Sequence, residues 1–583
     1  MKLFFSLLIS FLAVRGFRFE FTRSGLLLRN TETFVWLLMM LFFCQISLKS
    51  GKEPDRRLKK YALLYGLTIA VFTMLGKILS TLEYLAWIWE NPHNLMHFLN
   101  MLFSYWVLYY GFAFLAFGFL KQYRREKAPI ATDSFSMKKV LLIWAVLLIF
   151  YIPWWMYNFP GVVTPDSGTQ IRDALTTNTL SDWNPAFVTL LIRMVMVPVI
   201  RMTSSINTAV GVCTFLQMMI LTFVFALAFE RICRYLHNKT LQILIFLFYA
   251  VYPVNNIFSV TMWKDILFSA CFLGFFLCLD DCTENDKAFF SNKGKCLLLF
   301  LTMLLMPLLR HNGLFITLIM SIYMPFYFKR FRKTAAVLSC SVLILTAVWK
   351  LLILPGITTE PIPPGEYLSV PLQQITRVLV KRNEDLSPEI REEIQGWFTI
   401  PDIRTEYAEK TVDPVKKHFN SELFERNRGR FFSLWSRLGQ KYPVEYLEGF
   451  LHNNYGYWYP ETSWWITMSG IQMHDRIPEL QHTPILKLGI IDKINQWFTS
   501  EQYEKTPVLP LLFKPGACFW VWLFCGIFCL YQNRKKFVLF IPGFLLWFII
   551  LWSAVYCEYR YMYALFICLP VFLASALTCR RKE

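Results

Sequence analysis

Apolar runs recur along most of this chain, and nearly all of them have about 17 to 25 residues, the length of a helix that crosses about 30 Å of hydrocarbon. Each run is therefore a candidate membrane span. They lie at residues 33–49, 61–80, 97–120, 139–157, 206–229, 240–256, 262–280, 296–309, 313–328, 335–354, 515–531, 537–556 and 561–578. The sequence predicts an all-α polytopic membrane protein with about 13 transmembrane helices.

The overall composition excludes a water-soluble enzyme. Hydrophobic residues make up 55% of the 583 residues and charged residues only 17%, whereas soluble domains carry about 25% charged residues. Residues 1–14 are apolar but short, and arginines follow them. This segment is a first span, a signal-like segment or a surface helix, and no small-residue cleavage site favours its removal.

Lysine and arginine are distributed unevenly among the loops between the predicted spans. Short loops that are rich in these residues stay in the cytoplasm. With the end of 33–49 inside, the basic segments 52–60, 121–127, 231–239, 293–295, 329–333, 534–536 and 580–582 all lie on the inner side. These basic inner loops account for most of the net charge of +19, so no nucleic-acid partner is needed to explain that charge.

Segment 186–204 is apolar but is not counted as a span. Counting it would place the basic stretch 231–239 outside, and Arg193, Pro198 and Arg201 interrupt the run. We therefore expect a helix that lies in, or dips into, the outer membrane interface.

Residues 356–510 have the composition of a water-facing domain, because charged residues become frequent and the long apolar runs stop. Ser387 with Pro388 is typical of a helix start, as is Tyr442 with Pro443. No cysteine lies between residues 356 and 505. We expect one mainly helical extracytoplasmic domain without disulfides. The predicted organisation is N-terminal spans in 1–138, a membrane core in 139–355, the extracytoplasmic domain in 356–510 and C-terminal spans in 511–583.

An aromatic cluster that includes Tyr457 and Trp458 follows Asn453 and Asn454 in this predicted domain. Aromatic rings near a membrane surface most often form an interfacial belt. The alternative is a platform for a sugar ring or a lipid chain, with Asn454, Tyr457 and Trp458 as sugar contacts. The asparagines fit either interpretation, because they hydrogen-bond hydroxyls or close turns.

Residues 158–185 form the predicted outer loop between the span 139–157 and the interfacial helix, and this loop is acidic. Asp166 follows a proline and precedes a Ser-Gly pair. Its carboxylate either caps a helix that begins near Thr169 or faces a ligand just above the membrane. Asp182 and Asn184 close the loop, and they either cap the interfacial helix or contact an acceptor.

Two further polar groups stand at the predicted outer ends of spans, where an ionisable group in hydrocarbon costs about 2.5–3.5 kcal/mol or more. Lys264 and Asp265 begin one span, and Arg310 and His311 separate two spans with almost no loop. Lys264 and Arg310 are explained either as side chains that reach the lipid headgroups or as contacts to a phosphate. Gly313 permits a tight chain reversal after Arg310.

The last two predicted spans are joined by Glu558-Tyr559-Arg560-Tyr561. Arg560 offers a planar fork suited to phosphate, with Tyr559 beside it, or it anchors the chain at the outer surface. Gln373 and Arg377 share one predicted helix face, which we expect to be solvated.

Together these residues predict one outer cavity in which acidic Asp166 lies near basic Lys264, Arg310 and Arg560. An acid beside several cations suits group transfer from an anionic, lipid-linked donor. The cations stabilise charge that develops on the leaving phosphate, and the carboxylate orients or deprotonates the accepting hydroxyl.

The chain resembles the GT-C superfamily, the multi-span glycosyltransferases that use polyprenyl-phosphate sugars. The similarity covers an acid in the first long outer loop (TPDSG), an amphipathic helix after it, many spans, and a large domain before the last helices. The motifs YPVNN, WKDILF, RHNG, NNYGYWYP and EYRY are similar to an uncharacterised family of large bacterial multi-span membrane proteins. Two departures are Asn184-Pro185 in place of His-Pro and up to three additional spans before Asp166.

By this resemblance the expected function is transfer of a sugar from a polyprenyl-phosphate carrier to a cell-envelope glycan or lipid acceptor, on the outer face of a bacterial plasma membrane. Asp166 would be the catalytic base, and Lys264, Arg310, His311, Tyr559 and Arg560 would contact the phosphate. No cofactor is certain, and the need for a divalent metal is left open. The alternatives are a transporter or flippase and a polymerase or ligase of lipid-linked glycans.

Overall fold

The structure, a computed structural model, describes most of residues 55–578, with gaps at 128–134, 177–179, 359–361, 463, 473–476, 506–508 and 554. The described residues form helices and only isolated β-bridges. Eleven helices in this part of the chain are long and apolar enough to cross a membrane. The chain is an all-α polytopic membrane protein, which confirms the predicted fold class. The predicted span 33–49 and the segment 1–14 lie outside the described residues.

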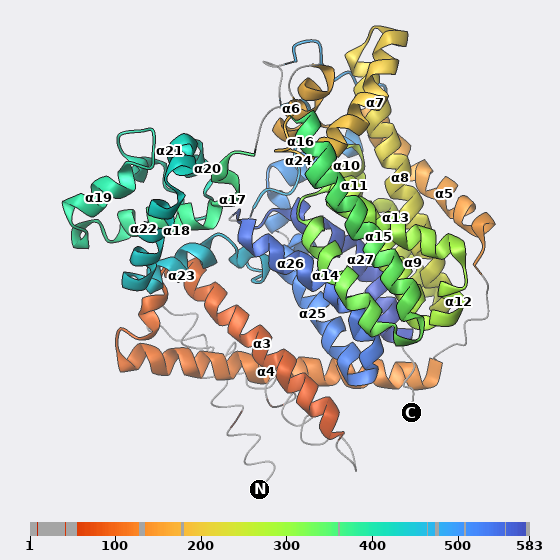
Figure 1. Cartoon of the computed structure of the whole chain (residues 1–583). Coiled ribbons are helices and arrows are strands. Elements are labelled where there is room, and N and C mark those ends of the chain that lie inside the picture. The colour runs from red at the N-terminus through yellow and green to blue at the C-terminus, as the bar shows by residue number, and fades with distance from the viewer. Residues whose placement is uncertain are drawn as a thin grey trace.

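Each predicted span from 61–80 onward coincides with helical structure (Figure 1). The bounds are α3 (Arg56–Thr81), α4 (Pro92–Lys127), α5 (Met137–Tyr157), α8 (Ile206–Tyr235), α9 (Lys239–Val251) with α10 (Pro253–Val260), α11 (Lys264–Glu284), α13 (Lys293–Leu309), α14 (Gly313–Tyr327), α15 (Arg332–Val348) with the π-helical segment η3 (Trp349–Ile353) and α16 (Leu354–Ile357), α25 (Pro515–Gln532), η9 (Arg534–Leu539) with α26 (Phe540–Ile550), and α27 (Tyr559–Thr578). Short helices α6 (Pro165–Leu175), α12 (Asp286–Phe290) and α24 (Gly489–Thr499) lie between them.

Helix α11 lies at the centre of the bundle. It packs against α8, α13 and α27, and its buried residues, from Ile266 to Cys282, cover most of its circumference. A helix that is apolar all round is stable only when neighbours enclose it. Helix α5 packs on the outer side of α8, α14 packs between α15 and α26, and the α3–α4 pair contacts α25.

Helices α13 and α14 are shorter than the other predicted spans. They have 17 and 15 residues, and 15 residues of helix extend only about 22 Å. The two helices form a hairpin with its turn at Arg310, and each is shorter than the about 30 Å of hydrocarbon in a bilayer. A Cβ on Gly313 would lie 2.2 Å from the Met306 carbonyl oxygen, so the reversal needs glycine for close approach to the preceding helix.

Segment 186–204 forms helix α7 (Ala186–Thr203), which is one of the eleven helices that meet the length and apolarity of a span. The Trp155 indole near the end of α5 donates to the Gly211 carbonyl of α8 at 3.0 Å, so α8 begins beyond the end of α5. Figure 1 shows α7 and the beginning of α8 projecting together at the top of the bundle. Its placement in the membrane interface stays a prediction.

A second hydrophobic core, spanning Leu368 to Tyr446, defines a separate polar domain. Its helices are α17 (Pro364–Tyr367), α18 (Ser369–Lys381), α19 (Pro388–Gln395), α20 (Asp413–Lys417), α21 (Ser421–Arg426), α22 (Arg428–Lys441) and α23 (Pro443–His452). The predicted helix starts at Pro388 and Pro443 are confirmed, with Ser387 capping α19. Residues from Tyr455 to Phe513 pack instead with the membrane helices.

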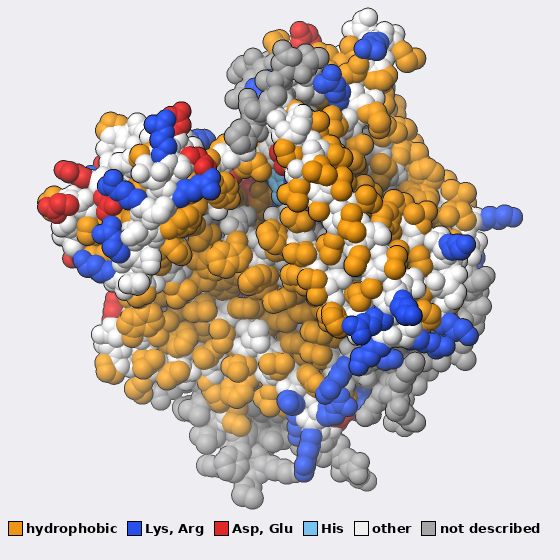
Figure 2. Space-filling model, viewed as in Figure 1, with side chains coloured by type: hydrophobic (Ala, Val, Ile, Leu, Met, Phe, Trp, Pro, Cys, Tyr) orange, Lys and Arg blue, Asp and Glu red, His pale blue; other side chains and the backbone are white. Residues whose placement is uncertain are grey.

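A buried ion cluster joins four helical elements at the opposite end of the bundle from α6. Asp280 of α11 accepts hydrogen bonds from Arg231 of α8 at 3.0 Å, from Lys536 of η9 at 2.8 Å and from Ser575 of α27 at 2.6 Å. Figure 2 shows lysines and arginines gathered toward this end, below a broad apolar face. We call it the basic end, and the opposite end the site end.

Candidate functional site

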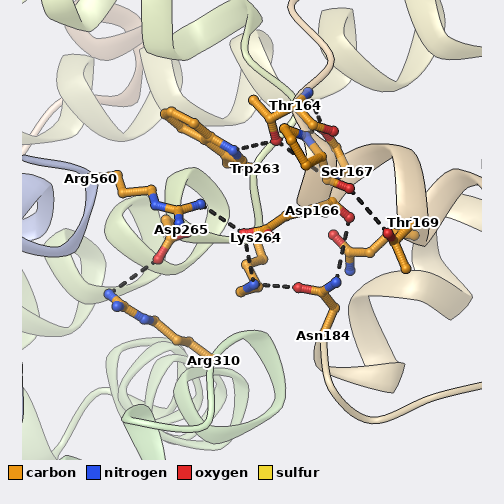
Figure 3. Close-up of polar contacts among 12 residues, drawn as sticks. Thr164, Asp166, Ser167, Thr169, Asn184, Trp263, Lys264, Asp265, Arg310 and Arg560 are labelled. Carbon is orange, nitrogen blue, oxygen red and sulfur yellow. Dashed lines mark hydrogen bonds and ion pairs between the residues drawn. The ribbon is translucent and has the colours of Figure 1, made fainter. Parts of the chain in front are cut away.

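The predicted polar residues come together at the site end from five separate segments (Figure 3). These segments are the start of α6, the loop before α7, the start of α11, the turn between α13 and α14, and the start of α27. We call the cluster that they form the charged site.

Asp166 is positioned by the first turn of α6. Thr164 is the N-cap and forms a capping box with Ser167, while the Trp263 indole donates to the Thr164 hydroxyl at 2.6 Å. The interpretation of Asp166 as a cap for a helix beginning near Thr169 is therefore wrong, since the helix begins at Pro165. The helix N-terminus favours a negative charge at Asp166.

Asp166 is ion-paired with two of the predicted cations. Its Oδ2 lies 2.8 Å from Arg560 Nη1 and 3.6 Å from Lys264 Nζ. Burial alone would raise the pKa of the Asp166 carboxyl, but Lys264 and Arg560 outweigh it and hold this pKa well below its usual range. Asp166 is thus ionised and weakly basic.

Lys264 and Asn184 complete this half of the charged site. The Lys264 ammonium donates to the Asn184 side-chain oxygen, and the Asn184 amide donates to the Asp166 carbonyl at 3.4 Å. Asn184 thus bridges α6 and α11 and does not cap α7. Asp265 does not pair with its neighbour Lys264 but with Arg310.

Arg310 forms a buried ion pair with Asp265. The Nη1 to Oδ1 distance is 3.2 Å, and the two side chains are 7% and 1% exposed. The Arg310 guanidinium also lies 4.4 Å from the centroid of the Tyr561 ring, which Arg560 approaches to 5.1 Å. Tyr561 therefore contacts both guanidinium groups, and the charged site is continuous from Asp166 to Arg310.

His311 and Asp182 form the third part of the charged site together with Lys350. The imidazole Nε2 lies 2.8 Å from the Asp182 carbonyl oxygen, and Lys350 Nζ lies 3.2 Å from Asp182 Oδ2 and 3.3 Å from His311 Nδ1. Asp182 also caps α7, since Ala186 N–H donates to its Oδ1 at 3.0 Å. Burial lowers the pKa of His311, and Lys350 opposes its protonation further while Asp182 favours it.

Sequence reasoning missed Lys350. It lies within the predicted span 335–354, and a lone charge near the end of a span is itself a signal of function. It also continues the inward-facing stripe of α15 that contains Ser339, Val342 and Thr346. That periodicity could have assigned Lys350 to the bundle interior.

Glu558 is a second residue whose part in the site was not predicted. Its Oε2 lies 3.3 Å from Arg560 Nε, and its Oε1 accepts a hydrogen bond from the Trp464 indole at 3.3 Å. Burial raises the pKa of Glu558 to about 7, against the opposing effect of Arg560. Its position next to Arg560 in the motif EYRY was the available signal.

Tyr559 does not reach the charged site, since its hydroxyl lies 3.0 Å from that of Tyr252 inside the bundle.

The aromatic cluster that includes Tyr457 and Trp458 is buried. The Trp458 indole donates to Asn454 Oδ1 at 2.9 Å, and the Tyr457 hydroxyl donates to the Val555 carbonyl at 2.8 Å. In this structure these side chains pack in the core of the membrane helices.

The expectation that Gln373 and Arg377 form a solvated face is wrong. Arg377 is 1% exposed and pairs with Glu448 at 2.6 Å. Gln373 donates to the Ala408 carbonyl at 2.7 Å. Both residues hold the polar domain together, and neither belongs to the charged site.

The charged site contains four fixed cations, Lys264, Arg310, Lys350 and Arg560, each within 4 Å of a carboxylate. An anionic ligand could exchange for these carboxylates, because phosphate accepts the same charge-assisted hydrogen bonds. Among the described residues, no three His, Cys, Asp or Glu side chains lie together in a way that could hold a metal ion. We therefore assign no metal ligands.

The fold and the charged site define a multi-span membrane protein with an ion-paired polar cluster at one end of its bundle. A family model described as "Family of unknown function (DUF6020)" matches residues 174–583, well over half of the chain. The chain belongs to this family. The match includes Lys264, Arg310, Lys350 and Arg560, whereas Asp166 precedes it. Neither the curated proteins nor the solved structures gave a match.

Proposed function

We propose that this protein is a GT-C-like glycosyltransferase that moves a sugar from a polyprenyl-phosphate carrier to a cell-envelope acceptor. The observation that carries the proposal is the contact of Asp166 with both Arg560 and Lys264, beside the buried pair of Arg310 and Asp265. A carboxylate held among several cations next to a lipid-facing surface suits a reaction between a hydroxyl and an anionic lipid.

In the proposed reaction an acceptor hydroxyl oxygen attacks the anomeric carbon of the sugar. The bond between that carbon and the phosphate oxygen breaks, and the polyprenyl phosphate leaves with the electron pair. Arg560 and Lys264 stabilise the additional negative charge on the leaving phosphate. The hydroxyl proton passes to the Asp166 carboxylate.

Donor binding would prepare Asp166 for this role. A phosphate that binds Arg560 and Lys264 neutralises the two positive charges that lower the pKa of Asp166. The carboxylate then becomes a stronger base at the moment when the acceptor is present. Free enzyme would thus hold a weak base, and the donor complex a competent one.

The proposed orientation places the charged site and the polar domain outside a bacterial plasma membrane. It is supported by the exposed Lys329, Arg330, Arg534 and Lys535 at the basic end, since basic loops stay in the cytoplasm. A polyprenyl-linked donor, membrane lipids and a glycan or lipid acceptor are the proposed partners.

The test is sugar transfer by the purified full-length protein in proteoliposomes, with polyprenyl-phosphate-linked sugars as donors and lipid extracts of a deletion strain as the source of acceptor. Accumulation of a polyprenyl-linked sugar in that strain, and its consumption by the protein, supports transfer. Movement of an unchanged lipid-linked glycan across the bilayer, without a new glycosidic bond, would instead establish the transporter alternative.

A further inference from the structure

A continuous apolar face leads from the middle of the bundle to the charged site. On α26 and the short 3₁₀ segment η10 (Leu551–Ser553) that follows it, the side chains of Phe544, Phe548 and Trp552 are exposed at spacings of four residues. Helix α14, which packs beside α26, exposes Phe315 and Ile322. These exposed faces belong to the broad apolar surface seen in Figure 2.

The turn at the upper end of this face carries the cations. Arg310 and His311 connect α13 to α14, and Lys350 reaches His311 from η3 at 3.3 Å. Figure 2 shows a hollow between the polar domain and the α14–α16 region, with acidic and histidine side chains recessed in it. The hollow therefore opens on the same side as the apolar face.

Lys350 stands in the wall between the charged site and the lipid. Its neighbours Leu351 and Leu352 are more than 70% exposed, whereas its own side chain is 22% exposed and points to Asp182. It lies within the π-helical segment η3, and π-helical turns in helices frequently mark functional sites. The Trp349 ring packs edge-to-face on Phe187 of α7 and fixes this wall beside the loop of Asp182.

We infer that the face between α14 and α26 binds the isoprenoid chain of a lipid phosphate. Its phosphate enters the hollow at Lys350, His311 and Arg310, from which the charged site continues through Tyr561 to Arg560 and Lys264, the cations that act in the proposed transfer. The chain is apolar and long, like the face, and the phosphate complements the cations at its upper end. The Asp182 carboxylate pairs with Lys350, and the phosphate of the lipid displaces this carboxylate from Lys350 when it binds. The inference rests on the proposed function for the identity of the carrier as a polyprenyl phosphate.

The head-group part is tested by binding of polyprenyl phosphate, in vesicles of neutral lipid, to the full-length protein. Lys350→Met should weaken binding about tenfold or more, because a charge-assisted contact is lost, and Lys350→Arg should retain most of it. Lys333→Met, at the basic end of the same helix, is the matched control. Asp182→Asn should preserve or strengthen binding, since it releases Lys350, whereas a purely structural ion pair would make Asp182→Asn and Lys350→Met equally harmful.

The chain part is tested by a benzophenone amino acid placed at position 548 or, as control, at position 149 on the exposed face of α5. Cross-linking to polyprenyl phosphate should occur at 548 and be much weaker at 149. Inorganic phosphate and a short prenyl phosphate should compete poorly, because they lack the chain.

Equal cross-linking at the two positions, equal competition by inorganic phosphate, or unchanged binding in Lys350→Met would overturn the inference. Binding that depends on Lys350 without any sugar transfer would leave this inference standing and remove the proposed function. Sugar transfer that is unchanged by substitutions at positions 350 and 548 would leave the proposed function standing and remove this inference.

Discussion

Asp166 and Arg560 are 394 residues apart in the sequence and form an ion pair of 2.8 Å between α6 and the start of α27. The Arg560 guanidinium also lies 5.1 Å from the centroid of the Trp263 ring, and Trp263 donates to the Thr164 hydroxyl that caps α6. The pair is therefore fixed from both sides, because the same indole contacts the cation and holds the helix that bears the acid.

Replacing the acid of this pair should abolish the proposed transfer. Asp166→Asn keeps the size of the side chain but removes a proton acceptor, so we expect kcat to fall by about 10²–10⁴-fold. Thr169→Ala, on a partly exposed position of the same helix, is the control for folding and should stay active. Transfer at the wild-type rate in Asp166→Asn would exclude the carboxylate from catalysis.

The buried pair of Arg310 and Asp265 allows stability to be separated from function. Arg310→Met leaves Asp265 as an unpaired buried charge and should lower the free energy of unfolding by about 3–5 kcal/mol. The double variant Arg310→Met, Asp265→Leu should regain most of that stability, since no charge is then unpaired, but should not regain donor binding. Thermal unfolding in detergent and donor affinity measure the two effects. Recovery of donor affinity in the double variant would show that Arg310 acts only structurally.

Glu558 should make stability depend on pH. Burial raises its folded-state pKa from 4.5 to about 7, so between these values the folded protein binds more protons than the unfolded chain. The stabilising contribution is present below about pH 4.5 and is lost as pH rises toward 7, with a total on the order of 3 kcal/mol. In Glu558→Gln the melting temperature should change less with pH between pH 5 and 7.5 than in the wild type. A wild-type profile that is already flat in this range would contradict the prediction.

The ion cluster at the basic end should be structural. Lys536 is 3% exposed and pairs with Asp280 at 2.8 Å, so Lys536→Met leaves Arg231 as the one cation paired with buried Asp280 and should cost on the order of 3 kcal/mol of stability. The exposed neighbour variant Lys535→Met should cost almost nothing. Neither change should alter donor affinity at permissive temperature. A selective loss of function in a stably folded Lys536→Met protein would instead favour a transport path through the bundle.

The predicted orientation can be tested by labelling of intact cells. Ser433→Cys lies on an exposed position of α22 in the polar domain, and Ser291→Cys lies on an exposed position near the basic end. A membrane-impermeant maleimide should label position 433 and should reach position 291 only after the cells are opened. The opposite pattern would invert the topology and place the charged site in the cytoplasm.

The membrane helices could be read from the sequence because each depends on its own composition. A run such as 206–229 is apolar over its whole length, and a backbone in lipid must satisfy its hydrogen bonds internally, which makes it helical. The same local reasoning located the helix starts at Pro388 and Pro443. It also gave α13 and α14 as the short runs 296–309 and 313–328, but it could not show that Arg310, in the turn between them, pairs with Asp265 of α11.

Side-chain partners could not be read in this way. Asp265 follows Lys264 directly but pairs with Arg310, and Lys350 reaches the charged site from a helix whose neighbouring side chains face lipid. Arg377 looked like a surface residue and is buried against Glu448. In each case the partner lies on another element, which adjacency in sequence does not reveal.

The sequence by itself determined that this protein is a bundle of membrane helices with polar residues concentrated at one end and basic loops at the other, because hydropathy and charge act on each segment separately. Only the tertiary structure decided which of those polar residues meet. The contacts of Asp166 with Arg560 and of Asp182 with Lys350 depend on how helices pack, and packing is set by side-chain shape across segments that are hundreds of residues apart.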